Sequence, residues 1–480
     1  MLGATFEEAR GGRFMIDRRL GIALTCLLIA SSGTAGVLIA HNRAVETAAS
    51  TSNPARQSTA TDAPAPSRNP GPSDSPDPSD SPEPTGSPVP DGGATGGTAQ
   101  THPSAGGPAS RSGSGPASGA ASALHFAGSS TVLIGGSMTD ASATAAPFDA
   151  RYAYVDSSPA PSADYYTAAK CQSAWSNWWG CWNGPTTSPG YYVTWREKVA
   201  AQATYNGSPR PQTMLWTWFM MPDLGKLSGL GDGPAEPGAI NRADVLTLYL
   251  NDYRFFLQKI GTSHDMIDLE PDFWGFVDAV GDPHHVPAQV TAADPTDCGS
   301  QENSAAGLAQ CLIAMAHKYA PNTEVGLHLT CWNWQSDVQG CVKDYASLGA
   351  QNADFLVADV SDRDAGWYAL PANGGSNTYW ADQQAKAALS YYKTMATSVG
   401  KPVVLWQIPV GNMSQNNRLN HYQDDKVDWL FAHMDQVAAA HIAGLFFGPG
   451  EGEQTTVESD GGNLISKTVA YRNIGGMALK

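Results

Sequence analysis

The sequence is poor in basic residues: 28 lysines and arginines stand against 45 acidic residues, which gives a formal net charge of −17. Nucleic-acid binding needs a basic surface, so this imbalance argues against DNA or RNA as a partner. No Gly-x-Ser-x-Gly elbow for acyl transfer and no Walker loop for phosphoryl transfer occurs in the chain. No Gly-x-Gly-x-x-Gly turn follows the first predicted strand either, which disfavours a dinucleotide-binding fold.

Cysteine is also scarce, with seven residues in 480. Cys26 lies in an apolar segment, and the other six fall into three short-range couples: Cys171 and Cys181, Cys298 and Cys311, Cys331 and Cys341. The spacing contains no Cys-x-x-Cys motif or histidine-rich tract, which argues against a zinc site. We therefore expect no metal and three local disulfides, which belong in an oxidising compartment, although spacing alone does not fix their connectivity.

An apolar stretch near the N-terminus, residues 20–40, contains 21 residues without a charge. Four arginines precede it, as the positive-inside rule expects for a segment whose N-terminus (1–19) stays in the cytoplasm. Its length favours a single-pass membrane anchor, whereas its small residues fit a cleaved signal peptide. Under either interpretation the rest of the chain lies outside the cytoplasm, on the membrane surface or secreted.

Residues 41–122 are rich in proline, serine and glycine and almost free of large apolar side chains. Such a segment cannot bury enough surface to offset the entropy of ordering it. We expect a disordered linker here, followed by one folded domain over 123–480.

Apolar runs alternate with helical patterns throughout that domain. Eight runs read as strands: 131–135, 149–155, 213–220, 264–270, 324–330, 353–359, 402–408 and 442–448. The helical patterns between them include 243–260, 305–319, 380–399 and 424–440. Eight such units connected by right-handed crossovers predict an α/β fold of the (β/α)8 TIM-barrel class.

Active sites of such barrels lie at the carboxyl ends of the strands, where this sequence collects acids and aromatics. Asp268 and Glu270 stand two positions apart at the end of the fourth predicted strand, so we expect both side chains on one face. Asp359 ends the sixth strand. The other candidates for substrate binding are Trp218, Asp223, Asp272, Trp274, His328, Trp334, Trp406, Gln407 and Glu451.

Carboxylates surrounded by tryptophans are suited to glycoside hydrolysis, in which one carboxyl protonates the leaving oxygen and another acts as nucleophile or base. We expect Glu270 to be the proton donor, with Asp268 raising its pKa by like-charge repulsion. Asp359 is the first candidate for the second carboxylate, ahead of Asp223 and Glu451, because strand ends hold side chains more rigidly than loops. For Glu270 and Asp268 alike, the competing interpretation is a structural role.

The stretch "LEP" at 269–271 resembles the Asn-Glu-Pro of a large clan of retaining barrel glycosidases, in which that glutamate is the acid/base. Leu269 replaces the asparagine, and Gln407 stands where the clan has its nucleophilic glutamate. "IDLE" at 267–270 is similar to the Asp-x-Glu of barrel muramidases, whose glutamate donates the proton. The wider pattern resembles bacterial extracellular barrel proteins of glycosidase type.

Residues and resemblance together predict an extracytoplasmic glycoside hydrolase that acts on a polysaccharide or cell-wall glycan without a cofactor. The main alternative is a non-catalytic carbohydrate-binding barrel, which Gln407 in place of a carboxylate would suit. A structural wall protein, using only the anchor and linker, is the third possibility.

Overall fold

The computed structural model describes residues 124–480, apart from 168–169, 175 and 451. The predicted cytoplasmic segment (1–19), anchor or signal peptide (20–40) and linker (41–122) lie outside the described residues, as does Glu451. Within the described part of the chain, no helix is both long enough and apolar enough to cross a bilayer.

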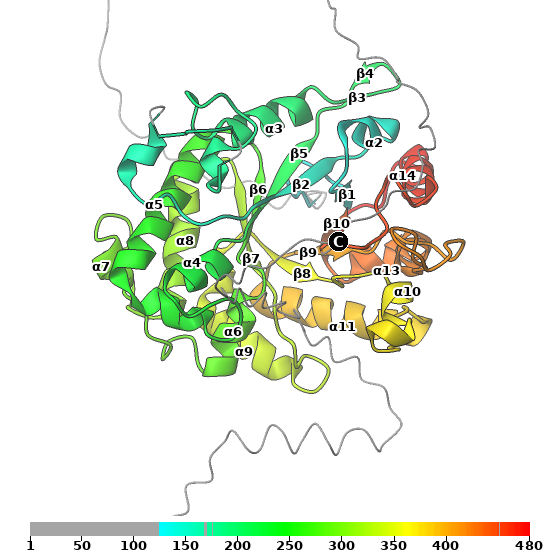
Figure 1. Ribbon diagram of the computed structural model, residues 1–480. Coiled ribbons are helices and arrows are strands. Elements are labelled where there is room, and N and C mark those ends of the chain that lie inside the picture. The colour runs from blue at the N-terminus through cyan, green and yellow to red at the C-terminus, as the bar shows by residue number, and fades with distance from the viewer. Residues whose placement is uncertain (1–123, 168–169, 175, 451) are drawn as a thin grey trace, which may run out of the picture. The chain divides into compact units, whose positions relative to one another are not determined.

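Eight parallel strands close into a barrel in the order β1-β10-β9-β8-β7-β6-β5-β2 (Figure 1). They are β1 (Leu133–Gly136), β2 (Ala150–Val155), β5 (Thr213–Trp218), β6 (Met266–Leu269), β7 (Glu324–His328), β8 (Phe355–Asp359), β9 (Val403–Ile408) and β10 (Ile442–Phe447). All eight predicted strands are present, and the (β/α)8 barrel is confirmed. A short antiparallel hairpin precedes β5, formed by the two-residue strands β3 (Thr204–Tyr205) and β4 (Ser208–Pro209).

Helices surround the strands (Figure 1). The α-helices are α2 (Asp140–Ala145), α3 (Tyr191–Ala201), α4 (Met221–Leu227), α5 (Ala243–Ile260), α6 (Phe273–Val280), α7 (Val290–Ala293), α8 (Ala305–Tyr319), α9 (Val338–Leu348), α10 (Ala365–Tyr368), α11 (Asp382–Val399), α12 (Lys426–Ala432), α13 (Met434–Ala439) and α14 (Asn463–Asn473). The predicted helix over 424–440 is divided at His433, whose ring stacks on Trp429 and whose Nδ1 bonds the Trp429 carbonyl.

Strand register separates two layers of side chains. Tyr154, Thr217 and Asp268 are directly paired along β2, β5 and β6, so they share the inward face. Trp216 and Trp218 alternate with Thr217 and therefore point outward, where both rings pack against Phe256 of α5. The barrel interior and the strand–helix layer are thus two distinct cores, and aromatic residues contribute to both.

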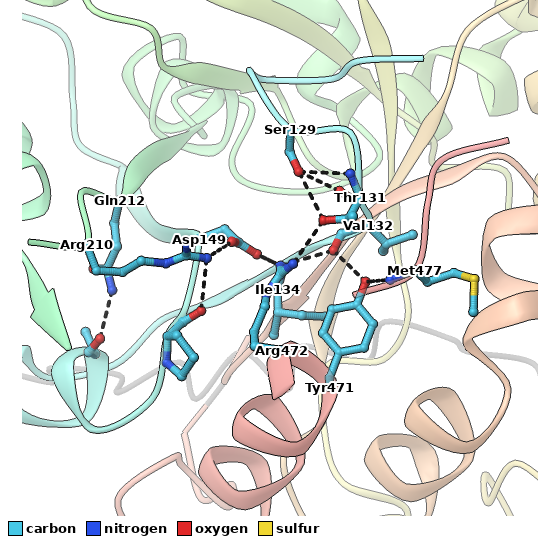
Figure 2. A network of polar contacts seen from close by, with 12 residues as sticks. Ser129, Thr131, Val132, Ile134, Asp149, Arg210, Gln212, Tyr471, Arg472 and Met477 are labelled. Carbon is cyan, nitrogen blue, oxygen red and sulfur yellow. Dashed lines mark hydrogen bonds and ion pairs between the residues drawn. The ribbon is translucent and has the colours of Figure 1, made fainter. Parts of the chain in front are cut away.

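An ion-paired cluster ties the last helix to the first strands (Figure 2). Asp149 bonds Arg210 through Oδ1 at 2.6 Å and Arg472 of α14 through Oδ2, while Oδ2 also accepts the Ile134 N–H. Tyr471, beside Arg472, donates its hydroxyl to the Val132 carbonyl. This network fixes the C-terminal segment to the amino-terminal ends of β1 and β2.

The three disulfides predicted from the cysteine couples are present: Cys171–Cys181, Cys298–Cys311 and Cys331–Cys341. Each lies in a connection that leaves the carboxyl end of a barrel strand, namely β2, β6 and β7. Each cross-link therefore constrains the connection between two neighbouring barrel strands.

Candidate active site

The carboxyl ends of β6, β7 and β8 bring Asp268, His328 and Asp359 together inside the mouth of the barrel. His328 Nδ1 lies 2.9 Å from Asp268 Oδ1, and both side chains are buried. Asp359 is only half-buried and ends β8 beside them, close enough for its charge to act on His328. Three predicted site residues from three neighbouring strands thus form one cluster.

The Asp268–His328 pair is poised to hold a proton. Burial raises the pKa of Asp268, because a carboxylate loses its hydration there. Burial opposes charge on His328 as well, but the adjacent carboxylate of Asp268, with Asp359 and Asp272 beyond, raises the pKa of the imidazole. The pair retains its shared proton to higher pH than a solvated carboxyl would.

Aromatic side chains form the wall beside these charges. The Trp406 ring lies 5.3 Å from that of His328 and 5.6 Å from that of Tyr154, measured between centroids. Tyr154 is half-buried, and its hydroxyl accepts a hydrogen bond from Gln407 Nε2. Burial raises the pKa of Tyr154 well above its usual value, and the charges of Asp359 and Asp268 contribute, so the hydroxyl stays neutral.

Glu270 occupies a different environment from Asp268, although it is only two residues away. The strand ends at Leu269, and Glu270 adopts φ +54°, which turns its side chain from the expected face. Its carboxylate accepts the Met220 and Met221 N–H groups at the start of α4 and the Tyr249 hydroxyl at 2.7 Å. The side chain is fully buried, and burial raises its pKa to about 8. The expectation that both carboxyls share one face is wrong.

Several predicted sugar-binding tryptophans lie in the protein core. Trp218 is enclosed beneath α5 by Tyr253 and Phe256, and Trp274 donates its indole N–H to the Leu269 carbonyl. Both are buried and expose no ring face to a ligand. Trp334 is half-buried and stacks on Tyr391 of α11 at 4.8 Å. Burial argues against sugar binding by Trp218 and Trp274, whereas sugar binding by Trp334 stays a prediction.

Two acidic predictions belong to the rim. Asp223 lies in the first turn of α4, half-buried, with its carboxylate 3.5 Å from Lys226 Nζ. Asp272 precedes α6 at φ +68°, and its backbone N–H donates to Thr330 Oγ1 at 3.2 Å. The rim thus holds further carboxylates around the central cluster.

Sequence reasoning missed Tyr152 and Tyr154 on β2. Their rings lie 5.8 and 5.6 Å from Trp406, so they complete the aromatic wall. The signal was present in "ARYAYV", where two tyrosines alternate with small and charged residues on a strand. Among the described residues, no group of three or more potential ligands is arranged to hold a metal ion.

Comparisons with known proteins give weak matches to solved structures alone. No protein-family model and no curated protein matches the chain. A modular endo-β-1,4-mannanase from Cellulomonas fimi is 11% identical with a TM-score of 0.42, over 71% of this chain and 70% of that one. An endo-β-1,4-mannanase from Thermotoga petrophila is 10% identical with a TM-score of 0.40, over 72% and 77%.

An endoglucanase from Mycobacterium tuberculosis is 16% identical with a TM-score of 0.25, over 45% of this chain. The match spans 56% of that enzyme's length. Matches of this strength do not bear on the chemistry at the mouth. The class of the protein is set by its own strands and site: a (β/α)8 barrel with carboxylates and aromatics at the carboxyl ends of its strands.

Proposed function

We propose that the protein is a glycoside hydrolase whose reaction takes place at the carboxyl ends of β6, β7 and β8. The observation that carries this proposal is the buried Asp268–His328 pair beside the half-buried Asp359. Glycoside hydrolysis needs one carboxyl that holds a proton and one that is ionised, and Asp268 and Asp359 differ in burial.

In this proposal Asp268 and Asp359 have different roles. Asp268, whose pKa burial raises, is the acid that protonates the leaving oxygen, and His328 positions it. Asp359 has partial access to solvent and acts as the nucleophile or as the base for water. The half-buried Tyr154 offers the surface against which a sugar packs, with the buried Trp406 and Gln407 behind it.

The contacts of Glu270 favour a structural role over the proton-donor role that its sequence position predicts. As a general acid, its carboxyl would have to leave two backbone N–H groups and the Tyr249 hydroxyl. We infer instead that Glu270 anchors the start of α4 to the end of β6.

We also propose that the protein works outside the cytoplasm on a polysaccharide. The three disulfides support an oxidising location. A membrane anchor or signal peptide at 20–40 remains part of this proposal and rests on the sequence alone.

The deciding experiment compares wild type, Asp359→Asn, Asp268→Asn and Glu270→Gln on cellulose, mannan, chitosan and peptidoglycan. The full chain is used, and both bound polysaccharide and new reducing ends are measured. We expect hydrolysis by wild type and roughly a 100-fold or greater loss in the two aspartate variants. The exposed Asp244→Asn variant, on the outer helix α5, serves as the matched control and is expected to behave as wild type.

Two results would overturn this mechanism. If folded Glu270→Gln loses hydrolysis while Asp359→Asn keeps it, Glu270 is the acid after all. If wild type binds a polysaccharide without releasing new reducing ends, the protein is a non-catalytic carbohydrate-binding barrel. This is the second candidate function. The enclosed Glu270 and the presence of Gln407 near the end of β9 favour it.

A further inference from the structure

Trp332 differs from the other described tryptophans in its exposure. Its side chain is 37% accessible, whereas every other tryptophan that the structure describes is buried or half-buried. It lies just beyond the carboxyl end of β7, four residues after His328. More than a third of this side chain is therefore open to solvent on the face of the barrel where active sites are found.

The indole is held in place by its neighbours. Its ring meets Phe276 of α6 edge-to-face, with 4.9 Å between centroids. A side chain at Gly275 would lie 3.0 Å from the Trp332 ring and 2.8 Å from the Thr330 methyl group, so glycine permits the close approach. The adjacent Cys331 is cross-linked to Cys341. Single exposed apolar residues are common on proteins, but a ring fixed on several sides differs from a mobile surface side chain.

The same contacts join Trp332 to the mouth. Thr330 packs beside Gly275, and its hydroxyl accepts a hydrogen bond from the backbone N–H of Asp272. The charge of Asp272 in turn contributes to raising the pKa of His328. The rim around Trp332 is therefore continuous with the Asp268–His328 side of the proposed site.

We propose that Trp332 is the stacking platform of a glycan-binding subsite at the rim, which binds a pyranose ring of the polysaccharide beyond the one being cleaved. The inference rests on the proposed function and narrows it: the substrate is a chain long enough to extend from the mouth to Trp332. A rigid aromatic face suits this role, because little conformational entropy is lost when a sugar packs on it.

Affinity electrophoresis of the full chain in gels containing soluble cellulose, mannan, chitosan or peptidoglycan fragments tests the subsite. We expect Trp332→Ala to weaken binding of the retained polysaccharide about tenfold, while Trp332→Phe, which keeps a ring face, stays within about threefold of wild type. Ile474→Ala is the matched control, since Ile474 is an exposed apolar residue after α14, at the opposite end of the barrel. It is expected to bind as wild type does.

Oxidation of wild type by N-bromosuccinimide, mapped by mass spectrometry, needs no variant and so does not depend on how Trp332→Ala folds. The retained polysaccharide is expected to protect Trp332. For hydrolysis of the same polymer we expect KM to rise about tenfold in Trp332→Ala with kcat within about twofold, and no change on a short aryl glycoside.

The outcomes separate this inference from the proposed function. If wild type hydrolyses a polysaccharide but Trp332→Ala binds it equally and Trp332 is not protected, the subsite is wrong and the function stands. If the polysaccharide protects Trp332 and binding falls in Trp332→Ala without hydrolysis by wild type, the subsite stands and the proposed enzyme does not. If wild type binds none of the four polysaccharides, both are wrong.

Discussion

At the scale of single residues, one backbone torsion separates the two carboxyls at the end of β6. Glu270 at φ +54° lies in a region that few non-glycine residues adopt. The turn places the Glu270 carboxyl beside three donors, which are the Met220 and Met221 N–H groups at α4 and the Tyr249 hydroxyl. Asp268 pairs with His328 instead. Strained backbone of this kind is retained when the surrounding structure determines it, as the three hydrogen bonds do here.

Glu270 should make stability depend on pH. Its pKa is about 8 in the folded protein, against about 4.3 in an unfolded chain. Between these values the native state binds one proton more than the unfolded state, so stability falls as pH rises, by at most about 1.4 kcal/mol per pH unit. Glu270→Gln lacks this group, and we expect its free energy of unfolding to vary less from pH 5 to 8.

Urea unfolding of wild type and Glu270→Gln at pH 5, 6, 7 and 8 measures the difference. The variant also leaves a backbone N–H without its carboxylate acceptor, a cost that is independent of pH. Parallel stability curves for the two proteins would contradict the raised pKa.

At the scale of elements, a buried carboxylate holds the long connection after β2. Asp252 of α5 is fully buried and accepts the indole N–H groups of Trp178 at 2.8 Å and Trp179 at 2.6 Å. The Cys171–Cys181 disulfide closes the same connection. The aromatic loop is therefore fastened to α5 by directed hydrogen bonds as well as by burial.

Replacing Asp252 by alanine should release this connection. Two buried indole N–H groups would lose their acceptor, and we expect the free energy of unfolding to drop by about 2–4 kcal/mol. Limited proteolysis should then cut within 157–190 before the rest of the barrel. Asp244→Ala, an exposed acid on the same helix, is the control, and equal protease resistance in both variants would show that Asp252 does not fasten the loop.

Elements were also the level at which the sequence was most informative. The helices predicted over 243–260 and 305–319 have those bounds in the structure, and all eight strands were located, because alternating apolar periodicity is a local signal. The break at His433 was missed, since it depends on a ring stacking on Trp429 and not on a helix-breaking residue.

Site residues were harder to predict than strands. Asp268, His328 and Asp359 lie together as predicted, because strand ends converge in a closed barrel. Trp218 points outward because it alternates with Thr217. The sequence alone does not show that Thr217 points inward, since this follows from its pairing with Asp268 of β6. The turn at Glu270 has no signature in sequence, because it is imposed by partners 21 and 50 residues away.

At the scale of the whole molecule, the Asp149 cluster joins the last helix to the first strands. Arg472 and Asp149 are largely buried, and Arg210 shares the same carboxylate. Closing a barrel requires its first and last strands to pair, as β1 and β10 do, and this cluster holds the C-terminal segment against that seam.

Loss of Arg472 should therefore weaken the entire fold. We expect Arg472→Ala to lower the free energy of unfolding by about 2–3 kcal/mol, because a largely buried carboxylate loses one of its two cations. Arg242→Ala, which removes an exposed pair with Asp244, should change it by no more than about 0.5 kcal/mol. Urea unfolding midpoints of the two variants provide the comparison, and equal shifts would contradict a special role for this seam.

The placement of the disulfides has a consequence for how the protein matures. All three cross-link connections leaving the carboxyl ends of strands, and none joins one barrel strand to another. The strands can therefore pair and close while every thiol is still reduced. Two of the bonds, Cys171–Cys181 and Cys331–Cys341, cross-link the aromatic loop and the segment that carries Trp332, so their formation constrains these two connections and not the closure of the barrel itself.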